Sequence, residues 1–295
     1  MKKLAGYTIG ILGGDKRERV MMESLIEAGA QLRVLGDPTG ELAKKVEIVN
    51  SLEELVEDID ALVAPMSGTD TEGMIKARFI DQPTYLDKIF FNLVDEGTPL
   101  LIGMANDKVK SLAEEANVKL QMIAVREDVG VLNAIPTAEG TLQIAMEEMA
   151  ITIHGCKSLV MGLGKCGLTL GWRLRALGSE TYGVTRSSDA IAKAKDLGIN
   201  TLTYEELDNY LGQFDLIVNT VPAMILPEDR IKELKSDALI IDLASAPGGT
   251  DFDAADKYGI RALLALGLPG KVAPRTAGLI LGNVVPEMIL EVLNK

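Results

Sequence analysis

The sequence predicts an α/β fold of two doubly wound parallel-sheet (Rossmann-like) domains with a cleft between them. The first observation is the length, because 295 residues suffice for about two domains. The second is the alternation of short apolar runs with helix-like runs along both halves, which is typical of parallel sheets covered by helices. The third is a glycine-rich turn at residues 162–167, which stands between a strand-like and a helix-like run.

The first half begins with a strand and keeps the alternation of strands and helices. Expected strands cover residues 7–12, 31–35, 61–64, 100–103 and 118–123. The capping box Ser51-Leu52-Glu53-Glu54 opens a short helix. Two longer helices are expected over 16–27 and 106–116.

The second half repeats this plan. Expected strands cover residues 158–162, 180–184, 201–202, 216–219, 238–242 and 262–265. An internal echo supports two related halves, since Leu52-Glu53-Glu54-Leu55 precedes strand-like residues 60–65 as Tyr204-Glu205-Glu206-Leu207 precedes 215–219. The shared physics of helix-to-strand units could also produce this echo without common ancestry.

The domain boundary is expected within residues 135–154, where Pro136-Thr137 begins a long helix over 138–149. The predicted parts are a substrate domain over 1–135, a linker helix over 136–153, an NADP-binding domain over 154–276 and a returning helix over 277–295. Two linkers imply a hinge and a cleft, where substrates commonly bind.

The turn at the centre of the chain has the G-x-G-x-x-G spacing of dinucleotide sites. Gly162 permits a tight turn, Gly164 lets the backbone approach a pyrophosphate, and Gly167 lets the helix pack closely on the strand. Free N–H groups at the helix start would then face the anion. The expected cofactor-binding residues here are Gly162, Leu163, Gly164, Lys165, Cys166 and Gly167.

The end of the next strand indicates NADP(H) as the cofactor. An NAD site usually carries Asp or Glu there to hold the ribose hydroxyls, whereas this strand runs into Thr185, Arg186 and Ser187. An arginine flanked by hydroxyls can bind a 2′-phosphate through charge-assisted hydrogen bonds. The alternative is that Arg186 is an exposed turn residue beside an NAD site.

Other loops at the carboxyl ends of strands supply further candidate ligands. The loop Thr220, Val221 and Pro222 is placed to contact the nicotinamide half of the cofactor. Backbone N–H groups of the Gly13-Gly14-Asp15 turn could hold a substrate carboxylate. The candidate substrate-binding residues are Gly14, Asp15, Ser67, Gly68, Arg126, Asn133, Ser245, Lys271 and Arg275. Plain turn or surface roles are the alternative for each.

Composition narrows the class of protein. The net charge of −13 argues against nucleic-acid binding and requires a local basic pocket for an anionic substrate. No run of 18 apolar residues occurs, so no membrane span is expected. Cys156, Cys166 and the single His154 cannot complete a zinc site, so no metal is expected, and two free thiols fit a reducing cytoplasm.

Four segments together resemble the family of A-type subunits of dipicolinate synthases: IPTAEG (135–140), TIHG (152–155), DLASAPGGTDF (242–252) and GLPGKVAP (267–274). The resemblance covers nearly the whole chain. It implies an NADP-dependent oxidoreductase of the diaminopimelate–lysine branch that makes dipicolinate from dihydrodipicolinate or its hydroxy-tetrahydro precursor. It further implies sporulation, the flavoprotein-like B-type subunit of dipicolinate synthase as partner, and the mother-cell cytoplasm of a spore-forming bacterium.

The implied substrate is a small ring with two carboxylates, which Arg126, Lys271 and Arg275 could bind. Hydride would leave the ring for NADP, and loss of a ring proton would complete the aromatic pyridine. Because aromatisation is strongly downhill, water could accept that proton. If the protein supplies the base, the candidates are Glu127, Asp128 and Asp242.

The same residues are also compatible with other functions. The domain plan is that of 2-hydroxyacid dehydrogenases and adenosylhomocysteinases, but 2-hydroxyacid oxidation needs a catalytic histidine and an arginine near Ser245. His154 precedes its strand, at the edge where ligands do not bind, so we expect it to be structural. The alternatives are an NADPH-binding non-catalytic partner, or an NAD-dependent enzyme like adenosylhomocysteinase or alanine dehydrogenase. We also expect a homo-oligomer.

Overall fold

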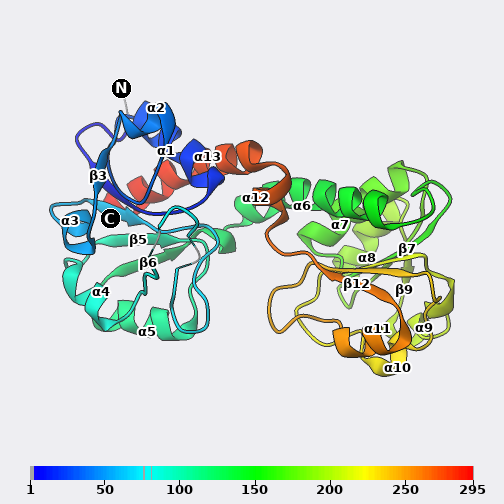
Figure 1. Cartoon of the computed structure of the whole chain (residues 1–295). Coiled ribbons are helices and arrows are strands. Elements are labelled where there is room, and N and C mark those ends of the chain that lie inside the picture. Colours follow the sequence, from blue (N-terminus) through cyan, green and yellow to red (C-terminus); the bar gives the residue numbers. More distant parts are fainter. Residues whose placement is uncertain (1–2, 76, 81, 295) are drawn as a thin grey trace. The chain divides into compact units, whose positions relative to one another are not determined.

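The computed structural model describes residues 3–75, 77–80 and 82–294, and its chain divides into two compact units. Unit 1 comprises Met1–Gly130 together with Ala273–Lys295, and unit 2 comprises Val131–Val272. Each unit is a six-stranded parallel sheet with helices around it (Figure 1). The predicted α/β fold of two parallel-sheet domains is thereby confirmed.

The sheet of unit 1 has the order β3-β2-β1-β4-β5-β6. Its strands are β1 (Thr8–Leu12), β2 (Gln31–Leu35), β3 (Glu47–Val49), β4 (Ala61–Val63), β5 (Pro99–Ile102) and β6 (Lys119–Met122). Its helices are α1 (Lys16–Glu27), α2 (Gly40–Ala43), α3 (Leu52–Val56), α4 (Lys88–Leu93), α5 (Asp107–Glu115) and α13 (Pro274–Leu293). The short 3-10 turn η1 (Ile123–Val125) follows β6.

The terminal helix α13 completes the core of unit 1 by packing along α1 (Figure 1). A Cβ atom on Gly278 would lie 2.6 Å from the carbonyl oxygen of Arg17, so glycine permits this close approach. Among the described residues, α13 is the one helix with the length and hydropathy of a membrane span. Its buried side chains, Val285 and Ile289 among them, belong to the core of unit 1, which explains that hydropathy.

The sheet of unit 2 has the order β12-β11-β10-β7-β8-β9. Its strands are β7 (Lys157–Met161), β8 (Glu180–Val184), β9 (Asn200–Leu202), β10 (Leu216–Asn219), β11 (Leu239–Asp242) and β12 (Arg261–Leu264). Its helices are α7 (Lys165–Ala176), α8 (Ser188–Asp196), α9 (Tyr204–Leu207), α10 (Glu228–Ile231), α11 (Phe252–Tyr258) and α12 (Leu268–Val272). The 3-10 turn η2 (Leu211–Gln213) precedes β10, and α6 (Glu127–Glu148) joins the two units in sequence.

Both sheets have the same strand order when each is counted from its own first strand, namely 3-2-1-4-5-6. In both units an aspartate carboxylate also accepts the N–H of the first residue of the first strand, which is β1 in unit 1 and β7 in unit 2. The Asp60 carboxylate accepts the N–H of Thr8 at 2.7 Å, and the Asp215 carboxylate accepts the N–H of Lys157 at 2.7 Å. The internal echo in the sequence therefore corresponds to a repeated structural unit.

The structure differs from the sequence-based expectation most at α6. The helix begins at Glu127 and not at residue 138, and it ends at Glu148, so residues 149–153 of the expected linker helix lie outside it. Pro136 stands inside the helix, where a proline removes one backbone hydrogen bond and usually marks an end. The Thr137 hydroxyl donates to the carbonyl of Asn133 at 2.7 Å, which adds a side-chain bond next to the proline.

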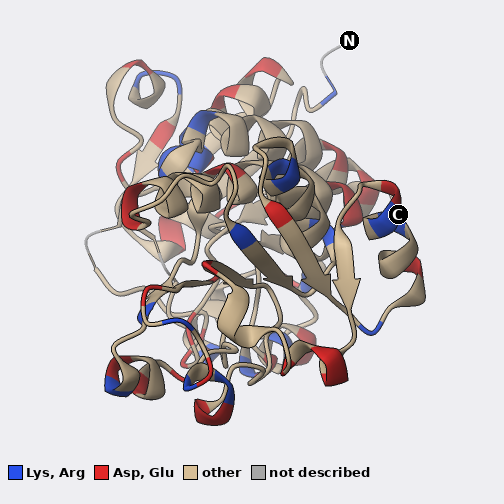
Figure 2. Cartoon of the chain, turned by 90° about the vertical axis from the view of Figure 1, so that its right-hand side faces the viewer, with Lys and Arg blue, Asp and Glu red and all other residues tan. Residues whose placement is uncertain are grey.

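Other elements also depart from expectation. The edge strand β3 and the helix α4 lie outside the expected elements, and β3 is only three residues long with two exposed side chains. The loop expected before the last helix forms α12, and α13 starts at Pro274, where proline suits a first helical turn. Acidic and basic residues are interspersed over helices and loops (Figure 2).

Candidate functional site

The strand order defines where ligands bind in each unit. In a doubly wound sheet, ligands lie beyond the carboxyl ends of the strands, at the point where the order reverses. In unit 2 this point lies between β7 and β10, which are neighbours in the sheet. The glycine-rich turn follows β7 and the Thr220–Pro222 loop follows β10, so the fold brings these two predicted segments together.

The two loops of unit 2 are tied to each other by Thr220. Its hydroxyl lies 3.0 Å from the carbonyl oxygen of Met161 and 3.1 Å from that of Gly162, and donates to them. Gly162 has φ +88°, and a Cβ atom there would lie 2.4 Å from the Thr220 hydroxyl oxygen. Glycine is therefore required at this tight turn.

The next two glycines have different surroundings. A Cβ atom on Gly167 would lie 1.8 Å from the carbonyl oxygen of Gly162, so the third glycine lets α7 pack against the turn. Apart from its chain neighbours, no atom of the described residues lies within 4 Å of a Cβ position on Gly164. Gly164 is also the N-cap of α7, and no side chain caps the helix. The open backbone and the uncapped N–H groups of α7 fit a pyrophosphate.

The remaining residues of the turn have distinct positions. Leu163 is buried in the core, and its side chain packs where a Cβ of Gly183 would lie, so its part is to support the turn. Lys165 and Cys166 form the first positions of α7. Burial raises the pKa of the Cys166 thiol despite the neighbouring Lys165 charge, so this thiol is neutral at physiological pH.

The loop after β8 presents Arg186 to solvent. Its guanidinium carbon lies 5.4 Å from the ring centroid of Tyr204, and among the described residues it has no ion pair. Ser187 caps α8 by accepting the N–H of Ala190 at 3.3 Å, and Thr185 accepts the N–H of Ser187 at 3.3 Å. An exposed arginine beside two hydroxyls is thus available at the strand end that reads the adenosine ribose in this fold.

A buried polar pair supports the loop after β10. Asn219 donates to Asp242 at 3.0 Å, and both side chains are fully buried. The Asp242 carboxylate also accepts from Ala244 N, Gly249 N and the Thr250 hydroxyl, at 2.7–3.1 Å. With four donors around it and no exposed surface, Asp242 positions the backbone after β10 and β11, which is a different task from the proton transfer expected of it.

Unit 1 has the same strand–turn–helix start, but a carboxylate fills it. Each N-cap follows the strand end by three residues, so Asp15 corresponds to Gly164 and Glu18 to Gly167. Glu18 is 2% exposed. Its carboxylate accepts the N–H of Asp15 at 2.7 Å and that of Met66 at 2.8 Å. Glu18 therefore joins the loops after β1 and β4.

The charges around Glu18 are closely coupled. Burial raises the pKa of Glu18, against the lowering influence of Arg17. Burial works in the same direction at Asp15, but its hydrogen bonds from Arg17 prevail and lower the pKa of Asp15. Arg17 binds the Asp15 carboxylate through two nitrogens, the closer at 2.9 Å. The N–H of Asp15, expected to hold substrate, therefore donates to Glu18 and does not face an open site. A Cβ atom on Gly14 would lie 2.6 Å from the Glu18 side chain.

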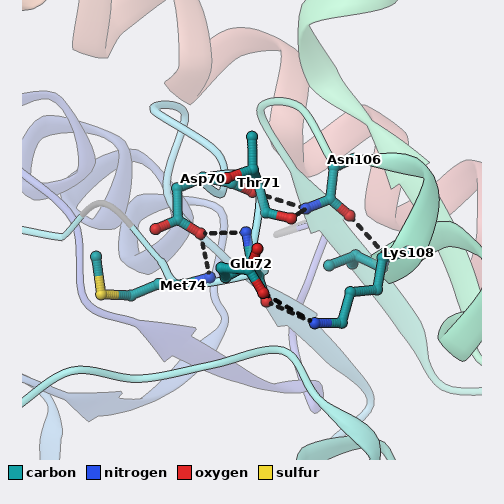
Figure 3. A network of polar contacts seen from close by, with 7 residues as sticks. Asp70, Thr71, Glu72, Met74, Asn106 and Lys108 are labelled. Atoms are coloured by element: carbon teal, nitrogen blue, oxygen red, sulfur yellow. Dashed lines mark hydrogen bonds and ion pairs between the residues drawn. The ribbon is translucent and has the colours of Figure 1, made fainter.

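Ser67 and Gly68 lie in the loop after β4, which polar contacts hold in place. A Cβ atom on Gly68, whose φ is +70°, would lie 2.3 Å from the carbonyl oxygen of Met104. Further along, Asn106 donates to the carbonyl of Asp70 at 2.7 Å while capping α5 (Figure 3). Ser67 and Gly68 thus occupy a fixed loop at the switch point of unit 1.

The predicted cluster before the linker helix lies at the start of α6. Arg126 pairs with Asp128 at 2.9 Å and with Glu291 at 3.4 Å. The hydrogen bond from Arg126 lowers the pKa of Asp128 and weakens it as a base. Glu127 is exposed in the first helical turn. Asn133, expected in a loop, is a half-buried residue within the helix.

The last predicted substrate ligands lie in both units. Ser245 is exposed in the loop after β11, and Lys271 is exposed in α12, both in unit 2. Arg275 is exposed in the first turn of α13 and belongs to unit 1. There it lines a groove of about 450 Å³ along α1. His154 lies before β7 at the amino end of the sheet, in agreement with a structural role.

Sequence reasoning missed two residues of unit 1. Glu18 could have been found, because Asp15-x-x-Glu18 is a capping-box pattern, and both of its hydrogen bonds are present. No sequence pattern marks Arg78, because it lies in a loop without periodicity. In the structure its N–H donates to the carbonyl of Gly14 at 2.9 Å. Among the described residues, no group of three His, Cys, Asp or Glu side chains could hold a metal.

Comparison with known proteins agrees with this geometry. A family model described as the N-terminal domain of the A-type subunit of dipicolinate synthase matches residues 8–124. A second, described as the D-isomer specific 2-hydroxyacid dehydrogenase NAD binding domain, matches residues 132–248. That match covers the uncapped turn of α7, so unit 2 contains a nicotinamide-dinucleotide-binding domain.

Several relatives resemble the chain over nearly its full length. The A-type subunit of dipicolinate synthase from Bacillus subtilis (strain 168) is 34% identical over 290 residues, covering 98% of each chain. The crystal structure of the same subunit from Bacillus halodurans is 32% identical with a TM-score of 0.90, covering 97% of this chain and 98% of that one. A transhydrogenase from Sinorhizobium meliloti, at 16% identity and a TM-score of 0.66 over 96% and 95%, shares the fold.

Proposed function

The chain belongs to the family of dipicolinate synthase A-type subunits, and from that premise we propose that it oxidises dihydrodipicolinate to dipicolinate with NADP⁺. A hydroxy-tetrahydro precursor would first lose water to give the same dihydro ring. The oxidation removes a hydride and a proton from the ring and leaves an aromatic dicarboxylate. NADP⁺ supplies the hydride acceptor when it is bound.

The observation that carries this proposal is the open start of α7. Gly164 leaves space for a pyrophosphate, and as the N-cap it offers no side chain to the first turn of the helix. Arg186 favours the phosphorylated form of the cofactor, because a guanidinium attracts the 2′-phosphate that an acidic residue would repel. Thr220, held against Gly162, marks the loop that would face the nicotinamide.

The proton acceptor is proposed from the surroundings of three carboxylates. Asp242 is enclosed by four donors, and Asp128 is bound by Arg126, which lowers its pKa. Asp242 is therefore out of reach of a substrate, and Asp128 is a weakened base. Glu127 is the third candidate, and its side chain is exposed in the first turn of α6. We assign the proton to Glu127, or to water where aromatisation alone suffices.

The family also suggests the setting of the reaction. The relatives are named as one subunit of dipicolinate synthase, so we propose that the chain works with the flavoprotein-like B-type subunit in the mother-cell cytoplasm during sporulation. A homo-oligomer is part of the same proposal. The substrate-binding residues proposed in unit 1 are Ser67, Gly68 and Arg275, and those proposed in unit 2 are Ser245 and Lys271.

The test uses the purified chain with NADP⁺ and dihydrodipicolinate, without any other protein. We expect NADPH absorbance to grow together with dipicolinate, and we expect NAD⁺ to support a much lower rate. Tight NADPH binding with no turnover until the B-type subunit is added would contradict the proposal. That result would favour the alternative of a cofactor-holding protein whose chemistry resides in its partner.

A further inference from the structure

Four arginines of unit 1 lie near the carboxyl ends of its strands, and three of them are engaged. Arg17 is bound by the Asp15 carboxylate and is 11% exposed at its side chain. Arg19 stacks over the ring of Phe79, with 3.8 Å from its guanidinium carbon to the ring centroid. Arg126 is paired with two carboxylates. These three guanidinium groups are already held by other side chains of the protein.

Arg78 is the fourth, and its surroundings differ. Its N–H donates to the carbonyl of Gly14 at 2.9 Å, while the carbonyl of the next residue, Phe79, accepts the N–H of Asp37 at 2.9 Å. The segment 77–80 therefore crosses the ends of β1 and β2, at the edge where ligands bind. The Arg78 side chain is exposed, and among the described residues it has no ion pair or hydrogen bond.

The chemistry of this edge requires an added cation. A cyclic dicarboxylate at this edge would meet the Asp15 and Glu18 side chains, which accept the N–H groups of Arg17 and Asp15. Arginine binds a carboxylate through two parallel hydrogen bonds, which lysine cannot reproduce. Building on the proposed function, we propose that Arg78 binds one carboxylate of the cyclic dicarboxylate substrate at the carboxyl ends of β1 and β2 in unit 1.

The experiment compares Arg78→Ala with Arg78→Lys and with the wild-type chain. Dipicolinate binding is measured by calorimetry, and KM for dihydrodipicolinate is measured in the presence of NADP⁺. We expect Arg78→Ala to raise the Kd of dipicolinate and the KM by about tenfold or more, since a charged hydrogen bond is lost. Arg78→Lys should recover part of this loss, and the Kd of NADPH should not change.

Lys119→Ala is the matched control. It also removes one exposed positive charge from unit 1, but it lies at the amino end of β6, on the opposite edge of the sheet. We expect it to bind dipicolinate like the wild type. Equal losses in both variants would overturn the proposal, because they would show a general charge effect.

The outcomes separate this inference from the function on which it rests. If the wild type binds dipicolinate and turns over, and Arg78→Ala does so with an unchanged Kd and KM, the role of Arg78 is wrong and the proposed function stands. If the wild type neither binds dipicolinate nor turns over, the proposed function fails and the role of Arg78 fails with it. Thermal unfolding of each variant shows whether it is folded.

Discussion

At the level of single residues, the same position in the two units carries opposite chemistry. Gly164 leaves the first turn of α7 open, whereas Asp15 and Glu18 close the first turn of α1 with their own carboxylates. We therefore expect a phosphate to bind at the turn before α7 and not at the turn before α1. In the proposed function, the exposed Arg186 side chain binds the 2′-phosphate, and the choice between NADP and NAD depends on it.

Arg186→Ala should weaken NADPH by about 1.5–3 kcal/mol, roughly a 10- to 150-fold rise in Kd, because a charge-assisted hydrogen bond to the 2′-phosphate is lost. NADH lacks that phosphate, so its Kd should stay nearly the same. Fluorescence titration of both cofactors measures this difference. Lys195→Ala, an exposed charge in the last turn of α8, serves as the control. An equal loss for NADH and NADPH would show that Arg186 does not select the cofactor.

The burial of Glu18 makes the free energy of unfolding depend on pH, and it also sets the direction of that dependence. Its pKa in the folded protein lies above the usual 4.5, so the fold favours the protonated form. The stability from this group is complete below the unfolded pKa and is lost as pH rises through the folded pKa. The free energy of unfolding of the wild type, relative to Glu18→Gln, should therefore fall as pH rises above 4.5.

Urea unfolding followed by circular dichroism at a series of pH values measures this difference. Both proteins contain Asp15 and Arg17, so subtracting one curve from the other isolates position 18. A difference that stays constant with pH, or that grows as pH rises, would contradict the raised pKa of Glu18.

Single residues also differ in how far the sequence alone can reveal them. The glycine turn is predictable, because its spacing, the preceding strand and the following helix lie within one short segment. Glu18 is recognisable as a cap, but its bond to Met66 joins residues 48 positions apart. Arg78 depends entirely on such a long-range contact, with Gly14, and no local pattern marks it.

At the level of elements, the strands and helices with strong local signals form as expected. The helix α1 and the strand β2 have the predicted bounds, since the spacing of their apolar residues marks both in the sequence. The expected start of α6 is wrong because proline usually favours a first helical turn, whereas this helix continues through Pro136. The strand β3 escapes prediction because an exposed three-residue edge strand has little pattern.

Two glycines at the start of α7 allow cofactor binding and folding to be tested separately. Gly164→Val should keep the fold, because its Cβ would meet open space and its φ of −77° suits any residue, but it should abolish NADPH binding. Gly167→Val should lower stability by about 1–3 kcal/mol, since its Cβ would overlap the Gly162 carbonyl. Chemical unfolding together with NADPH titration measures both effects. Full NADPH binding by Gly164→Val would mean that the pyrophosphate lies elsewhere.

At the level of the whole molecule, the two units share one fold but differ at the turn after their first strand. Both sheets have the same strand order and the same aspartate anchor beneath the first strand. The alternation of strands and helices in the sequence predicts the fold class of both units, a parallel sheet covered by helices. The difference between the two units is harder to predict from the sequence. It depends on the buried side chain of Glu18 in unit 1 and on the N-cap glycine of α7 in unit 2.

The difference between the two turns predicts how many dinucleotides each chain binds. Because Glu18 occupies the turn of unit 1, a dinucleotide has one place to bind, at the turn before α7 in unit 2. Calorimetric titration of the purified chain with NADPH is the direct measurement. We predict one site per chain, absent in Gly164→Val. Two sites per chain, or one site that survives in folded Gly164→Val, would contradict the account.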